Sequence, residues 1–138
     1  MKSKLFGVLL LIETAALLLT AAVAWHYQRV AGETDMRCFL LTAALTGSVG
    51  LLLYNIGNMF RRSALQIRDS FLVVALSWVL FSLFGMLPFL MYGTVDNVTD
   101  AFFETMSGFS TTGATVLNNI DTQPHGILFW RSVMQWLG

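Results

Sequence analysis

The chain has 138 residues, of which 56% are hydrophobic and 12% charged; with a mean hydropathy of +0.67, this composition excludes an ordinary soluble domain and indicates an integral membrane protein. Eight basic and eight acidic residues cancel, so the charge balance gives no indication of a nucleic-acid partner. The single cysteine, Cys38, excludes an internal disulfide, and the sequence shows no metal-ligand cluster, nucleotide-binding loop or catalytic pattern typical of an enzyme or a cofactor site.

The first apolar run, residues 5–25, is long enough to span a bilayer. Lys2 and Lys4 precede it, a feature that a secretory signal peptide shares. A membrane span is favoured because the run exceeds the ~7–15 apolar residues of a signal peptide and contains Glu13. Since a carboxyl group is costly in lipid, we expect Glu13 to face other helices or water, as a structural residue rather than a transport site.

A short polar loop and a second span are predicted next. The loop covers residues 26–37, and its charged side chains are Arg29, Glu33, Asp35 and Arg37. The second span covers residues 38–60, and the small residues that suit it to close helix packing are Ala43, Gly47, Gly50 and Gly57. A basic loop follows the span, with Arg61, Arg62 and Arg68.

The third span, residues 71–92, leads into a segment that is too short and too polar to cross a membrane. Pro88, near the end of the span, is expected to kink or end that helix. Residues 99–109 are predicted to form a helix of roughly 16 Å, about half of a ~30 Å hydrocarbon core. Thr99 or Asp100 can cap its start, and its predicted apolar face consists of Phe102, Phe103, Met106 and Phe109.

Residues 110–115, Ser-Thr-Thr-Gly-Ala-Thr, follow this short helix as a predicted extended loop. Irregular backbone is tolerated at membrane depth only where protein buries it or where it lines a watery path. A half-length helix and a Thr/Gly loop between two spans therefore favour a re-entrant pore loop, whose carbonyl and hydroxyl oxygens can bind a partly dehydrated cation. The alternative is a simple turn between two helices, which these few residues alone would favour.

Beyond a polar loop, residues 126–138 begin another apolar helix. That helix reaches only about 20 Å, short of a full span. We therefore expect the chain to be the N-terminal part of a longer protein, and we expect that it does not conduct ions alone. His26 and His125 are predicted to lie at membrane edges, as interfacial side chains rather than ligands.

The orientation follows from the basic residues near the spans. With a cytoplasmic N-terminus, the inner basic residues are Lys2, Lys4, Arg61, Arg62 and Arg68. The outer ones are fewer, which obeys the positive-inside rule: Arg29, Arg37 and Arg131. The pore loop then opens outward, with Glu104 deeper and with three carboxylates around its mouth: Asp96, Asp100 and Asp121. This cluster is expected to attract cations, although each aspartate alone fits a solvated loop equally well.

Several motifs occur in a fixed order over the second half of the chain: Leu87-Pro88-Phe89, Asp100 to Glu104, Ser107-Gly108, Thr111 to Thr115, Leu128 to Arg131 and Gln135 to Gly138. On these motifs, the chain resembles the first pore repeat of the TrkH-type potassium uptake proteins, in the Trk/Ktr/HKT superfamily of cation transporters. Such proteins have four helix–pore loop–helix repeats, and TrkH-type members carry two extra leading helices. The resemblance implies an all-α integral membrane fold, with two leading transmembrane helices in residues 1–69 and a first repeat, its second helix truncated, in residues 70–138.

The resemblance also implies potassium uptake, with the ion bound by the carbonyls of Thr111, Thr112 and Gly113 and by the Thr111 hydroxyl at the inner end. Potassium is then the transported substrate, and no cofactor is expected. The implied partners are membrane lipid, a cytosolic nucleotide-binding regulatory subunit of TrkA type and, in the full-length form, a second copy. The implied location is the bacterial inner membrane. Two alternatives stay open: an accessory or sensor membrane domain without transport, and a small homo-oligomeric cation channel.

Overall fold

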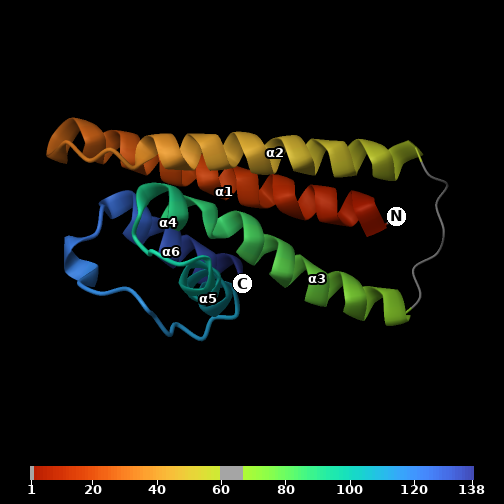
Figure 1. Ribbon diagram of the computed structural model, residues 1–138. Helices are drawn as coiled ribbons and strands as arrows, with labels where there is room; N and C mark the ends of the chain where they lie inside the picture. The colour runs from red at the N-terminus through yellow and green to blue at the C-terminus, as the bar shows by residue number, and fades with distance from the viewer. Residues whose placement is uncertain (1, 60–66) are drawn as a thin grey trace.

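The computed structural model describes residues 2–59 and 67–138. In chain order the elements are α1 (Lys2–Ala31), α2 (Met36–Met59), α3 (Ile67–Gly85), α4 (Leu87–Tyr92), α5 (Val98–Phe109), the short 3₁₀ helix η1 (Ile120–Thr122) and α6 (His125–Leu137) (Figure 1). No strand occurs within the described ranges, and the predicted all-helical class is confirmed. Arg61 and Arg62 of the expected basic loop lie outside the described residues.

Among the described residues, three helical segments are long and apolar enough to cross a membrane: Ser3–Ala31, Met36–Met59 and Ser70–Tyr92. Large apolar side chains are exposed along all three, for example Leu19, Leu52 and Phe71. Such a surface would be unfavourable in water, but it matches the apolar chains of lipid. The three segments therefore indicate a membrane-embedded protein.

Helices α1 and α2 form a long antiparallel hairpin along one side of the molecule (Figure 1). Glycines allow their backbones to approach closely. A Cβ atom on Gly57 would lie 2.5 Å from the Lys4 backbone nitrogen, and one on Gly7 would lie 2.5 Å from that of Tyr54. A Cβ atom on Gly50 would have more room, at 3.2 Å from that of Leu10 and 3.3 Å from the Gly7 carbonyl oxygen. The small residues predicted for close packing in the second span therefore lie where the two helices meet.

The loop between α1 and α2 is shorter than predicted, since it covers only residues 32–35. Helix α1 continues through the polar residues after Trp25, because residues such as Gln28 and Arg29 are good helix formers. Gly32 ends the helix in the left-handed region, at a φ of 73°, and its N–H donates to the Gln28 carbonyl at 3.1 Å. The resulting tight turn carries Glu33 and Asp35.

The third predicted span is divided in two, since α3 ends at Gly85 and α4 starts at Leu87. The cause is Pro88, which has no N–H to donate and whose ring crowds the preceding turn. The Gly85 carbonyl, at the end of α3, accepts the indole N–H of Trp130 at 3.0 Å. The break in the span therefore joins α3 to α6.

The core lies where α1, α2, α4, α5 and α6 converge, and its largest buried side chains are Phe39, Phe89, Phe109 and Trp130. Glu13 of α1 is also fully buried, and its carboxylate faces Gly85 of α3. Neither of its oxygens has a hydrogen-bond partner within the described part of the chain. This placement confirms that Glu13 faces neighbouring helices rather than lipid.

Candidate functional site

The short helix α5 has 12 residues and packs against α3 and α6. It begins at Val98, one residue earlier than predicted, so the N-cap position belongs to Asn97, which makes no capping side-chain hydrogen bond. The prediction that Thr99 or Asp100 caps the helix was therefore wrong. The predicted apolar face was also incomplete: Phe103 is 46% exposed, while small and polar residues face the protein, namely Ala101, Glu104, Thr105, Ser107 and Gly108.

The loop after α5 folds back on the C-terminal end of that helix. The N–H of Thr111 donates to the Gly108 carbonyl at 3.0 Å, and the N–H groups of Thr112 and Gly113 donate to the Ser107 carbonyl at 3.0 and 3.3 Å. The loop achieves this by placing Thr111 and Gly113 in the left-handed region, at φ values of 57° and 75°. Only glycine adopts such angles without strain, so Thr111 is held there by its surroundings.

This arrangement leaves the loop's carbonyl groups free. Within residues 2–59 and 67–138, no hydrogen bond engages the carbonyl oxygens of Thr111, Thr112 or Gly113, and all three residues are exposed. The next carbonyl is different, because that of Ala114 accepts the Ser107 hydroxyl at 2.7 Å. The three residues predicted to bind the ion are therefore the stretch whose N–H groups are satisfied and whose oxygens are available.

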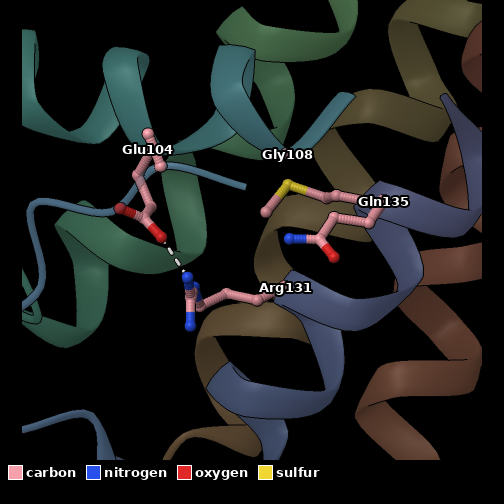
Figure 2. A pocket seen from close by; sticks show the side chains of 6 residues that line it. Glu104, Gly108, Arg131 and Gln135 are labelled. Atoms are coloured by element: carbon pink, nitrogen blue, oxygen red, sulfur yellow. Dashed lines mark hydrogen bonds and ion pairs between the residues drawn. The ribbon is translucent and has the colours of Figure 1, made fainter. Parts of the chain in front are cut away.

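Glu104 holds the far end of the loop. It is only 2% exposed, and its Oε2 accepts the hydroxyl of Thr115 and the N–H of Val116, both at 3.0 Å. Its Oε1 accepts Nε–H of Arg131 at 2.6 Å. Figure 2 shows the two charged groups pointing toward each other from α5 and α6. One carboxylate thus joins the pore helix, the loop and α6.

This role changes the interpretation of both charged residues. Glu104 was expected deep in an acidic mouth, but it is buried and paired, so it is not free to attract cations. Arg131 was counted among the outer basic residues, but it belongs to α6 and neutralises Glu104. The sequence could indicate that each of them faces the protein, because a carboxyl and an arginine within membrane segments are buried and paired, but it could not identify them as partners.

The remaining three carboxylates of the predicted mouth lie outside this network. Asp96 and Asp121 are exposed, and Asp100 is half-buried. Asp100 accepts the side-chain amide of Asn97 at 3.4 Å. None of the three forms an ion pair with another described residue.

Gln135 of α6 is a further side chain beside the loop, which the sequence analysis named only as part of a motif and not as a site residue. It lies one turn after Arg131 on the same side of the helix (Figure 2). Its Nε2 atom is 3.6 Å from the position that a Cβ atom on Gly113 would take. The space behind the loop, lined by Glu104, Gly108, Arg131 and Gln135 among others, has no room for a water molecule.

Comparison with known proteins shows which family the chain resembles. The family model described as TrkH, cation transport protein, matches residues 32–138. The Trk system potassium uptake protein TrkH of Halomonas elongata is 43% identical over 103 residues, which cover 74% of this chain and 21% of that protein. The protein of the same name from Escherichia coli strain K12 is 35% identical over 137 residues, which cover 99% of this chain and 27% of that protein.

The crystal structure of the potassium transporter TrkH from Vibrio parahaemolyticus matches with a TM-score of 0.85 and 35% identity, over 98% of this chain and 28% of that one. The chain therefore spans about a quarter of the length of these relatives. At this identity and coverage the likeness extends to sequence as well as fold. The chain belongs to the TrkH family of cation transport proteins, a family of transporters rather than enzymes.

Proposed function

We propose that the chain forms the leading hairpin and the first pore repeat of a potassium uptake transporter, in which the carbonyls of Thr111, Thr112 and Gly113 bind the ion. The relatives from Halomonas elongata and Escherichia coli are potassium uptake proteins by name. The observation that carries the proposal to this chain is the row of three exposed, unengaged carbonyl oxygens, fixed from behind by their own N–H groups. Oxygens held in this way can replace part of the hydration shell of potassium.

The charges around the loop favour the binding of a cation. The C-terminal end of α5 carries a partial negative charge and is followed directly by the loop. The Glu104 carboxylate neutralises Arg131, so the arginine does not repel a cation nearby. The loop contains one glycine where the TVGYG filters of potassium channels contain two. Fewer carbonyls can line its outer end, and we expect weaker selectivity for potassium over sodium than in those channels.

The proposal also covers the outer mouth of the pore, the membrane and orientation of the transporter, and its partners. Asp96, Asp100 and Asp121 would raise the cation concentration at the outer mouth. The full-length protein would sit in the bacterial inner membrane as a homodimer in contact with lipid, with a cytoplasmic N-terminus and a cytosolic nucleotide-binding subunit of TrkA type. These features come from the resemblance and from the charge distribution of the sequence.

The central test uses a chimaera in which these 138 residues replace the matching segment of the Vibrio parahaemolyticus transporter, produced in a host deficient in potassium uptake. Gly113→Ser places a side chain beside the ion and penalises the φ of 75°. We expect potassium uptake to fall and relative sodium uptake to rise.

Gly93→Ser is the matched control for this substitution. Gly93 also has a positive φ, of 81°, and a Cβ atom there would meet nothing within 4 Å. It ends α4, away from the loop, so the same backbone penalty should lower stability without altering selectivity. Unchanged transport by Gly113→Ser, at equal protein amounts, would contradict the proposed site.

Orientation is tested by thiol labelling in intact cells, in the chimaera without Cys38 and without the other accessible cysteines. A cysteine at Asn118, in the loop before η1, should react with an impermeant reagent. One at Asn58, an exposed residue near the end of α2, should react only after the cells are opened. The reverse pattern would invert the proposed topology.

A further inference from the structure

The start of α6 depends on a side chain from a distant part of the chain. The first N–H groups of a helix have no partners within it, and Pro124 at the N-cap position provides no side-chain hydrogen bond. Glu33, from the loop between α1 and α2, fills this role. Its Oε2 accepts the N–H of His125 at 3.0 Å, and its Oε1 lies 2.7 Å from Nδ1 of the same residue. The His125 ring in turn stacks on Tyr27, with centroids 4.0 Å apart.

A second residue of the same loop packs tightly against the start of α6. Asp35 is fully buried and lies against Gly126 so closely that a Cβ atom on Gly126 would overlap its Oδ2. The same Cβ would lie 2.9 Å from that of Ala24 in α1. A negative charge at this end of a helix is favourable. The loop between α1 and α2 therefore holds α6 by charge and by shape.

Helix α6 is a rigid link from this loop to the ion-binding loop. Arg131 lies six residues after His125, about 9 Å along the axis, and its guanidinium binds Glu104, which binds Thr115 and Val116. At the other end of α6, Gly138 packs directly on the Phe109 carbonyl, where α5 ends. A small shift of the start of α6 would therefore reach the Glu104 ion pair.

We propose that Glu33 is a positioning residue for the ion-binding loop. It sets the axial position of α6 and of Arg131 on that helix, and Arg131 in turn holds Glu104. The inference rests on the proposed function, because its effect is on ion selectivity. It also assigns a role to the leading hairpin beyond anchoring in the membrane, since the connection of that hairpin determines the geometry of the pore repeat.

The test compares variants of the same chimaera at matched protein amounts. Glu33→Ala removes both contacts to His125 and should lower the ratio of potassium to sodium uptake at least about twofold, as expected for a residue linked to a site through a contact network. Thr34→Ala is the control, because Thr34 is an exposed neighbour in the same loop, and it should leave the ratio unchanged. Glu33→Gln keeps an acceptor for the His125 N–H and should give a smaller decrease.

The outcomes separate positioning from simple anchoring. An unchanged ratio and an unchanged potassium KM in Glu33→Ala would overturn the inference and leave Glu33 a structural anchor. If Glu33→Ala does not accumulate in the membrane, Glu33→Gln decides by the same criterion. Gly113→Ser is measured in parallel: if it changes the ratio while the Glu33 variants do not, the inference alone fails. If Gly113→Ser also leaves the ratio unchanged, the proposed function fails.

Discussion

The leading hairpin and the pore loop are held in place by different forces. Helices α1 and α2 satisfy their own backbone groups, so their contact needs only matching shape, which Gly7, Gly50 and Gly57 provide. The loop after α5 is not helical, and its backbone groups need outside partners. It obtains them from Ser107, Gly108 and Glu104. Regular elements in a membrane can thus rely on packing, whereas irregular ones require directional bonds.

The largest effect is expected where directional bonds converge, at Glu104. Glu104→Ala leaves Arg131, Thr115 and Val116 without their acceptor, and removing one partner of a buried ion pair costs about 3–5 kcal/mol. We expect the purified chimaera to melt at a much lower temperature and to lose uptake.

A double variant sharpens this prediction. Glu104→Gln with Arg131→Gln removes both charges and keeps hydrogen-bonding groups of similar size, so it should recover part of the stability lost in Glu104→Gln alone. If the stability losses of the two single variants simply added up in the double variant, the ion pair would not be what holds the loop.

A smaller effect, of a different kind, is expected in the hairpin. Gly57→Ala would bring a methyl group to 2.5 Å from the Lys4 backbone, and such overpacking costs about 1–3 kcal/mol. Gly47→Ala is the control, because the nearest atoms to its methyl would belong to a side chain, that of Thr14, at 3.1 Å. Gly57→Ala should lower the melting temperature without changing the ratio of potassium to sodium uptake. A changed ratio would show that packing near this end of the hairpin also reaches the pore loop.

The sequence predicted those features that depend on local pattern. The apolar runs, the short α5 and the Thr/Gly loop follow from residue type and length, and the small residues in the second span indicated close packing. What it could not supply were contacts between distant residues. Glu104 and Arg131 are far apart in the chain, and each was interpreted alone. The loop of residues 32–35 was predicted too long because polar residues were taken as non-helical. That error left Glu33 as one polar residue of a long loop, whereas the structure places it in a tight turn, in contact with His125.

The smallest effect on stability is expected at Asp35, where close packing and electrostatic interactions act on the same side chain. Burial, together with the charge of Glu33, raises the pKa of the Asp35 carboxyl from its ordinary value of 3.8. Neither oxygen has hydrogen-bond geometry to a described residue, but the nearby N–H groups of Asp35 itself, Gly126 and Ile127 favour the charged form. Burial outweighs them, so the folded protein binds this proton more tightly than the unfolded chain does.

The resulting contribution to stability is complete below the ordinary pKa and is lost as the pH rises through the raised value. Asp35→Asn cannot titrate and should lack this component. We therefore expect the variant to gain stability relative to the parent chimaera as the pH rises, with melting temperatures of both measured from pH 4 to pH 8. Carboxylates that do not interact with Asp35 behave alike in the two proteins and cancel in the difference. A parent that instead gained on the variant with rising pH would show that the α6 N-terminus stabilises a charged Asp35 more than burial disfavours it.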